Sequence, residues 1–207
     1  MPNVAVVDYG MGNLRSVMNA LGELSVAAEL ITEPASVDRF ERLLLPGVGA
    51  FAQAIATLRK SGMADALDRF VSSGRPVLGI CLGMQLMCSM SEEDGMHEGL
   101  GWVPARVVSF PRSRGLKIPH MGWNALHLER SDPLFDGIDE ASDVYFVHSY
   151  YVACERAADV LASTEHGVAF ASIMGRKNLY GMQFHPEKSQ SIGLRLLANF
   201  LRLPSQC

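Results

Sequence analysis

The residues best able to do chemistry are a cysteine and a histidine that lie far apart in the chain. Cys81 stands between glycines in Gly79-Ile80-Cys81-Leu82-Gly83, where a buried strand is expected to end and a helix to begin. This pattern is typical of a tight strand-to-helix turn that raises a nucleophile above a sheet edge. A helix N-terminus also favours the thiolate form of cysteine. The segment therefore predicts a nucleophilic cysteine, and the alternative is a cysteine buried in the core.

A cysteine nucleophile needs a base, and His185 is the best candidate. It follows a predicted strand, and Pro186 ends that strand so that the histidine falls at the sheet edge. Glu187 is two residues further on, so in an extended chain its carboxylate points to the same side and can orient the imidazole. The alternative is a loop histidine beside a surface glutamate. Taken with the cysteine turn, the pattern predicts a Cys81, His185 and Glu187 triad for acyl transfer.

The elements that must position these residues follow from the hydrophobic pattern. In the first half, strands are expected at 4–9, 28–32, 42–45 and 76–80, and helices at 14–24, 50–70 (broken near Gly62) and 82–90. In the second half, strands are expected at 102–110, 125–128 and 144–153, a hairpin at 169–174 and 179–184, and a helix at 189–201. We therefore expect one α/β domain over residues 1–207. Its mostly parallel central sheet would carry helices on both faces, with a smaller antiparallel sheet beside it.

Composition narrows the class of protein. The net charge of −4 and the hydrophobic fraction of 48% indicate a globular chain without the basic surface of a nucleic-acid or membrane-surface binder. There is no evident signal peptide and no apolar run long enough to span a membrane. The four cysteines match no disulfide framework, which favours a reducing, cytoplasmic location. No metal site and no phosphate-binding glycine loop is indicated, so no cofactor is expected.

Several motifs resemble a known family. Gly-Ile-Cys-Leu-Gly-Met-Gln at 79–85 and Gln-Phe-His-Pro-Glu at 183–187 resemble the two signatures of class I, triad-type glutamine amidotransferases, and Leu-Pro-Gly-Val-Gly at 45–49 resembles the oxyanion strand of that family. Other stretches resemble one branch, the glutaminase subunits of imidazole glycerol phosphate synthase: residues 8–14, 46–51, 119–124, 145–150 and 184–189. The resemblance implies a flavodoxin-like fold and hydrolysis of glutamine to glutamate and ammonia. It also implies a partner, a (β/α)₈-barrel cyclase subunit, which uses the ammonia in histidine biosynthesis.

The resemblance also implies roles for residues around the triad. The oxyanion would be held by the backbone N–H of Leu82 and by that of Val48 or Gly49, and glycines on both sides of Val48 would let this peptide flip. The expected contacts to glutamine are Gly47, Gly49, Gln85, His148, Ser149 and Tyr150. The expected partner or gating residues are Asn13, Trp123, Tyr145 and Lys188, although a buried core position is an alternative for Trp123.

Three other functions fit part of this evidence. A different amidotransferase glutaminase, for example one feeding a surface-sugar synthase, would share the triad. A cysteine peptidase or esterase would share the strand-to-helix turn. A catalytically inactive binding module would share only the fold, and the intact triad argues against it. Release of ammonia from free glutamine separates the first of these from the other two.

Overall fold

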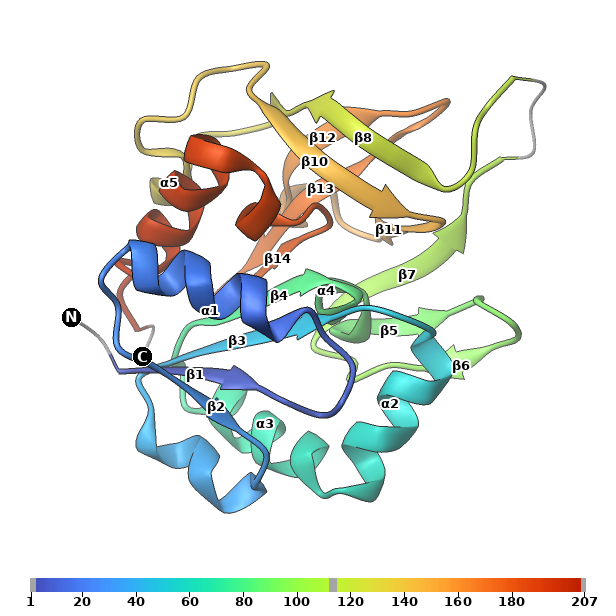
Figure 1. Cartoon of the computed structure of the whole chain (residues 1–207). Helices are drawn as coiled ribbons and strands as arrows, with labels where there is room; N and C mark the ends of the chain where they lie inside the picture. The colour runs from blue at the N-terminus through green and yellow to red at the C-terminus, as the bar shows by residue number, and fades with distance from the viewer. Residues whose placement is uncertain (1–2, 112–114, 206–207) are drawn as a thin grey trace.

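A sheet of eight strands forms the centre of the protein. Figure 1 shows the computed structural model, which describes residues 3–111 and 115–205. The strand order is β2-β1-β3-β4-β14-β13-β12-β9. The first five strands run parallel: β2 (Ala28–Ile31), β1 (Val4–Val7), β3 (Arg42–Gly47), β4 (Val77–Cys81) and β14 (Leu179–Met182). The other three are antiparallel: β13 (Ala169–Arg176), β12 (Val160–Glu165) and β9 (His127–Leu128).

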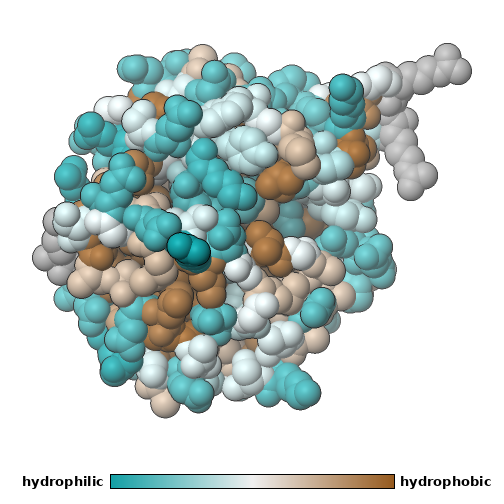
Figure 2. All heavy atoms as spheres, in the orientation of Figure 1, coloured by the Kyte–Doolittle hydropathy of each residue, from teal (hydrophilic) through white to brown (hydrophobic). Residues whose placement is uncertain are grey.

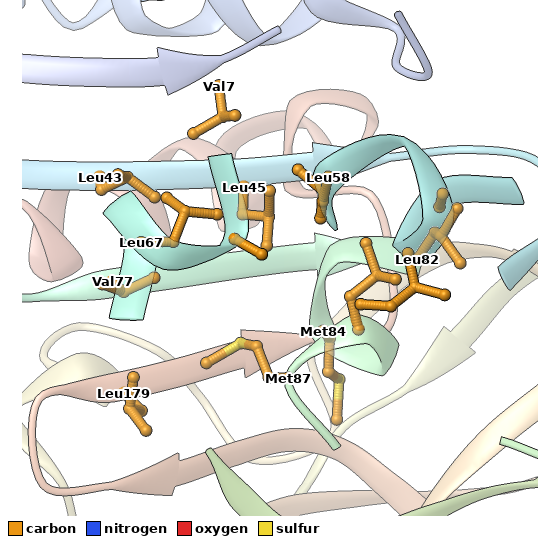
Figure 3. Packing of buried hydrophobic residues seen from close by; sticks show 14 of the residues in the cluster. Val7, Leu43, Leu45, Leu58, Leu67, Val77, Leu82, Met84, Met87 and Leu179 are labelled. Carbon is orange, nitrogen blue, oxygen red and sulfur yellow. The ribbon is translucent and has the colours of Figure 1, made fainter. Parts of the chain in front are cut away.

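Helices cover both faces of this sheet because its parallel strands are apolar on both sides. Val4 and Val6 pack on one face with α1 (Leu14–Glu23) and α5 (Gln190–Phe200). Ala5 and Val7 pack on the other face with α2 (Phe51–Lys60) and α3 (Met63–Ser72). Figure 3 shows this second core, in which side chains of the strands meet those of the two helices. The expected break between the helices is confirmed at Gly62, whose φ of +74° suits glycine.

Two small sheets lie beside the central one. One pairs β10 (Asp143–His148) with β8 (His120–Ala125), antiparallel. The other has the order β11-β7-β5-β6, built from Tyr150–Cys154, Val103–Ser109, Cys88–Ser91 and His97–Glu98. The chain passes from one small sheet to the other at Ser149. Short 3₁₀ turns complete the fold: η1 (Pro34–Arg39), η2 (Pro133–Phe135), η3 (Ala157–Asp159) and η4 (Pro186–Lys188).

The expected α/β class with a mostly parallel central sheet is confirmed, but three local predictions are wrong. The helix expected over 82–90 is only α4 (Leu82–Leu86). It stops because the Leu86 and Met87 carbonyls accept hydrogen bonds from residues 100–103, which places Cys88 in a strand. The strand expected over 144–153 is two strands in different sheets. Strands β8 and β12 extend over residues for which no strand was predicted.

The final helix and the hairpin before it are where the sequence placed them. β13 and β14 pair antiparallel across the turn at 177–178, and α5 follows η4. In the described part of the chain, no helix has both the length and the apolar character that crossing a membrane requires.

Candidate active site

Cys81 lies at a turn that only small neighbours allow. It is the last residue of β4 and precedes α4, with φ +54° and ψ −110°. That conformation costs a non-glycine residue free energy and is common at functional sites. A Cβ on Gly83 would overlap the Leu45 carbonyl oxygen, and one on Gly79 would clash with the Gly83 backbone and the Met87 sulfur. The two glycines of the motif therefore allow the close approach of backbones that lifts the thiol above the sheet edge.

His185 is brought beside Cys81 by strand pairing. β14 pairs parallel with β4, with Met182 opposite Ile80, so both strands end at the same edge. The His185 N–H donates to the Tyr145 carbonyl at 3.0 Å, and the Ser189 hydroxyl donates to the His185 carbonyl at 2.7 Å. These bonds hold the backbone of the histidine from both sides.

Glu187 completes the arrangement that the sequence predicted. Its Oε1 lies 2.8 Å from His185 Nδ1, and both side chains are almost fully buried, at 1% and 3% exposure. The carboxylate thus makes Nδ1 the protonated nitrogen and turns Nε2 toward the pocket.

The electrostatics of the site favour a charged imidazole. Burial alone would lower the pKa of His185, but Cys81 and Glu187 raise it to about 9. Nε2 of His185 has no hydrogen-bond partner among the described residues. Catalytic hydrogen bonds often tighten only when substrate binds.

A pocket of about 410 Å³ opens beside these side chains. Its lining residues are Val48, Gly49, Cys81, Leu82, Gln85, Glu93, Pro119, Val147, His148, Ser149, Tyr150 and His185. It therefore collects nearly all the residues predicted to contact glutamine or its oxyanion. A larger open groove of about 840 Å³ lies by η2 and the end of α5 and contains no triad residue, so size alone does not mark the site.

Gly47 is the predicted substrate contact that does not line this pocket. It is buried at the end of β3, where a Cβ would overlap the Tyr9 hydroxyl. Its role in the structure is to let Tyr9 approach the strand. The Tyr9 hydroxyl is itself buried and has no hydrogen-bond partner among the described residues.

Hydrogen bonds inside the site also involve residues that the sequence did not single out. Gln85 Nε2 donates to the Tyr150 carbonyl at 3.0 Å and to Gln183 Oε1 at 3.1 Å. Gln183 Nε2 in turn contacts Cys81 Sγ at 3.9 Å. Gln183 is fully buried. It opens the 183–187 motif, but the sequence analysis gave it no role of its own.

Glu93 is the second residue that sequence reasoning missed. It lies after β5, and its Oε2 accepts a hydrogen bond from the Phe51 N–H at 2.8 Å. Burial raises the pKa of its carboxyl above the usual value. Its sequence neighbours are other acidic residues, so no motif distinguished it from a solvated surface run.

The predicted oxyanion donors are in two different states. Leu82 opens α4, so its N–H has no intrahelical acceptor and lies next to the nucleophile. The Val48 N–H instead donates to the Met11 carbonyl at 3.3 Å. Gly49, the next residue, has a φ of +108° that an L side chain rarely adopts. The Val48 N–H, just after β3, is therefore bonded to the backbone of Met11 and not directed into the pocket.

Three of the four predicted partner or gating residues lie together. Trp123 on β8 is opposite Tyr145 on β10, and their rings meet edge to face at 5.8 Å. Lys188 Nζ lies 6.0 Å from the Tyr145 ring. Trp123 is 48% exposed, so the alternative of a core tryptophan is wrong. Asn13 is the N-cap residue of α1.

Hydrophobic side chains are exposed on the same side of the molecule as the pocket. Met121 is 63% exposed and Val48 is 39% exposed. Figure 2 shows hydrophobic side chains near the middle of its face, between the part formed by β8 and β10 and the part formed by α1 and α2. Exposed apolar groups beside a pocket are typical of a protein interface.

The fold and the site together define a class of enzyme. A family model for class I glutamine amidotransferases matches residues 5–203. The chain belongs to the class I glutamine amidotransferase family. Solved structures share the fold: a GMP synthase subunit from Thermoplasma acidophilum gives a TM-score of 0.74 at 22% identity, covering 97% of this chain and 92% of that one. The PurLQS structure from Thermotoga maritima gives 0.76 at 18%, covering 97% of each.

Sequence relatives narrow the class to one branch, the HisH subunits of imidazole glycerol phosphate synthase. The HisH subunit of Desulfitobacterium hafniense is 49% identical over 95% of this chain and 92% of its own length. Those of Syntrophotalea carbinolica and Geobacillus thermodenitrificans are each 47% identical, covering 95% and 97% of this chain and 98% and 96% of their own lengths.

Proposed function

We propose that Cys81, His185 and Glu187 are the catalytic triad with which this HisH-family glutaminase releases ammonia from glutamine. The observation that carries the proposal is the meeting of three groups at one sheet edge. Cys81, which has a strained backbone, and His185, whose pKa Cys81 and Glu187 raise to about 9, line one pocket, and the buried Glu187 carboxylate is hydrogen-bonded to His185.

The chemistry follows from these positions. The Cys81 thiolate attacks the side-chain amide carbon of glutamine, and the amide C–N bond breaks as the His185 imidazolium protonates the departing nitrogen. Glutamate is then held as a γ-thioester. Neutral His185 removes a proton from water, which attacks the thioester and releases glutamate. Glu187 stabilises the imidazolium that donates its proton in the first step and that forms again in the second.

The amino-acid end of glutamine finds complementary groups in the same pocket. Glu93 supplies a carboxylate for the α-ammonium group. The segment Ser149–Tyr150 supplies backbone and hydroxyl groups for the α-carboxylate. Gln85 is held by two hydrogen bonds at the pocket wall and shapes the space between them. This arrangement distinguishes an amino-acid substrate from a peptide, since a peptide has no free charges at these positions.

The Val48 peptide is the proposed switch. In this structure its N–H is bonded to the Met11 carbonyl, so a developing oxyanion would have only the Leu82 donor. Loss of one such donor typically reduces turnover by about 10²–10³-fold. Turning the Gly47–Val48 peptide would align the second donor, and the glycines on either side of Val48 permit that rotation.

The partner is a (β/α)₈-barrel cyclase subunit, and the face that carries Met121, Trp123 and Val48 is where it would dock. Docking there would cover the exposed apolar side chains and lie next to the pocket from which ammonia leaves. Lys188 and Asn13 would act as contact or gating residues at the edge of this face. The chain works as one domain over 1–207, in a reducing cytoplasm that keeps the Cys81 thiol free.

Substitution of Cys81 tests the proposal most directly. In the complex with the cyclase, Cys81→Ala is expected to abolish synthesis with glutamine and to preserve synthesis with ammonium salts. His185→Ala is expected to reduce glutamine turnover by at least about 10⁴-fold, and the double variant no further, because triad residues act as a unit. Continued turnover of glutamine by Cys81→Ala would mean that another group is the nucleophile.

A second assay tests the switch. Ammonia release from glutamine is measured for the free chain, for the complex, and for the complex with the nucleotide ligand of the cyclase. Activity is expected to be lowest in the free chain and to rise about 10²-fold or more when both partner and ligand are present. Full activity of the free chain would show that the Val48 peptide does not limit turnover.

A further inference from the structure

A chain of hydrogen bonds runs from β8 to the nucleophile through two histidines. His148 Nδ1 lies 2.8 Å from the Tyr150 carbonyl, and His148 Nε2 lies 2.9 Å from His120 Nδ1. Asn124 Nδ2 lies 3.2 Å from His120 Nε2. The Tyr150 carbonyl also accepts from Gln85, which continues the chain through Gln183 to Cys81 Sγ.

The direction of each bond is fixed at both ends. The Tyr150 oxygen can only accept, so His148 carries its proton on Nδ1 and accepts at Nε2. His120 must then donate from Nδ1 and accept at Nε2. The amide of Asn124 has the required orientation, because its Oδ1 accepts from the Ala125 N–H at 2.9 Å and its Nδ2 also donates to the Glu165 carbonyl at 2.9 Å. The network is complete only with both rings neutral.

The surroundings of the two rings keep them in place and neutral. Both are buried, and His120 stacks on Phe146 at 4.7 Å and on His166 at 4.0 Å. The His166 Nε2 is hydrogen-bonded to the Lys117 carbonyl at 2.9 Å, which fixes that ring as well. No group of three potential metal-binding side chains among the described residues, these histidines included, is arranged to hold a metal ion.

The place of the network in the fold suggests its purpose. It clamps β8 to the point where the chain leaves β10 and enters β11, which is Ser149 in the pocket wall. β8 carries Met121 and Trp123, whose apolar side chains are 63% and 48% exposed. A shift of β8 would therefore move His120, then His148, and then the backbone at Ser149 and Tyr150.

We infer that His120 is a positioning residue for the glutaminase reaction: through His148 it sets the Ser149–Tyr150 segment that receives the amino-acid end of glutamine, and it links this segment to the exposed face of β8. The inference rests on the proposed glutamine pocket. His120 touches neither the substrate nor the triad, so its removal weakens glutamine binding and leaves the chemical step intact. Removal of His120 is therefore expected to raise KM more than it lowers kcat.

Two substitutions of His120 separate positioning from packing. His120→Phe keeps the stacking but removes the donor to His148, which leaves a buried acceptor unpaired. His120→Asn loses more of the ring, yet its Nδ2 stands close to the place of the histidine Nδ1 and restores the donor. In the complex, His120→Phe is expected to raise the KM for glutamine about tenfold with kcat within about twofold of the wild type. His120→Asn is expected to recover most of that loss.

Two controls and a replacement variant make the result decisive. Co-elution of each variant with the cyclase subunit and an unchanged circular dichroism spectrum show that the chain is folded and docked. His127→Phe, an exposed histidine on β9 outside the network, is expected to change neither constant. If His120→Phe does not fold, Asn124→Leu takes its place, since Asn124 is only half-buried and ends the same chain of bonds.

The outcomes are distinct. A raised KM in His120→Phe with recovery in His120→Asn supports the inference. The inference is overturned if KM and kcat are the same for His120→Phe as for His120→Asn, or if kcat falls at unchanged KM. Cys81→Ala is run in the same assay: persistence of its glutamine turnover would refute the proposed site itself, whereas its inactivity together with an unaffected His120→Phe would refute only the role of His120.

Discussion

Cys81 and His185 end neighbouring strands, but the protein holds them in different ways. Cys81 is held by steric constraint: a positive φ, and glycines that let the turn lie against the Leu45 backbone. His185 is held by hydrogen bonds: its ring donates to Glu187, its backbone N–H donates to the Tyr145 carbonyl, and its own carbonyl accepts from the Ser189 hydroxyl. The position of Cys81 is therefore built into the parallel sheet. The position of His185 depends in addition on a contact with β10, a strand of the small antiparallel sheet.

This difference has a consequence for regulation. The turn around Cys81 has no room to adjust, because a shift would create overlaps in the core. The contacts that hold His185 include the backbone of Tyr145, whose side chain lies beside Trp123 and Lys188 on the expected docking face. A partner that moves β10 therefore acts on the base and the substrate pocket while the nucleophile stays fixed.

The largest expected effect on glutamine turnover concerns Glu187, which is hydrogen-bonded to His185. Glu187→Gln keeps the size of the side chain but removes its charge, so the imidazolium that acts in the first step and forms again in the second loses its stabilisation. Glutamine turnover in the complex is expected to fall by about 10⁴-fold, as for the third member of other triads. Circular dichroism should show an unchanged fold, and a fall of less than about tenfold would mean that Glu187 does not orient His185.

The pH profile sharpens the same point. His185 stays protonated up to a pKa of about 9 because Cys81 and Glu187 outweigh the opposing effect of burial. As pH rises through that value, the imidazolium that protonates the leaving nitrogen is lost, and kcat is expected to fall. In Glu187→Gln one of the raising charges is absent, so the alkaline limb should move to lower pH. An unchanged limb would assign it to a different group.

Substitutions in the glycine turn beside Cys81 are expected to destabilise the fold. Gly83→Ala places a Cβ against the Leu45 carbonyl, which cannot move without disturbing β3. The free energy of unfolding in urea is expected to fall by about 3 kcal/mol or more. Gly22→Ala is the matched control, because Gly22 lies in α1 and an added Cβ there meets nothing within 4 Å. It should stabilise the chain by about 0.5–1 kcal/mol, and equal effects would refute the steric argument.

The same contrast explains what the sequence could predict. The parallel half has local signals: apolar runs for the strands, glycines at the turn, and a proline after His185. The second half depends on pairings between separate segments. The helix expected over 82–90 stops where residues 100–103 bond to it and where β5 pairs parallel with β7. The hydrophobic periodicity of 82–90 carries no information about hydrogen bonds from residues 100–103. Here those tertiary hydrogen bonds prevail over helix propensity.

The site shows a similar division. The proposed triad could be put forward from the sequence because each member stands in a motif whose geometry is local, and the structure brings the three residues together. Glu93 and Gln183 were missed because their role comes from what faces them, the Phe51 N–H and the Gln85 amide. The motifs that contain His120 and His148 were recognised, yet nothing in their spacing showed that the two rings would be hydrogen-bonded across paired strands.

The smallest expected effect concerns stability at acid pH and the histidine side of the site. Burial lowers the pKa of His148 to about 3, with His120, His166 and His185 facing it and opposing its charge further. An unfolded histidine titrates near 6.5, so between that pH and about 3 the unfolded chain binds a proton that the folded chain does not. Stability from this group is present above pH 6.5 and is lost as pH falls, by at most about 1.4 kcal/mol per pH unit.

Urea unfolding of wild type and His148→Asn between pH 4.5 and 7 measures that contribution. The variant retains a donor for the Tyr150 carbonyl but has no titrating ring, so its stability should fall less steeply with acid even if it is lower at pH 7. The slopes should differ by about 1 kcal/mol per pH unit below pH 6. His127→Asn removes an exposed histidine and should follow the wild type. Parallel curves for His148→Asn and wild type would show that the ring is charged in the folded state, which the hydrogen bond to His120 does not allow.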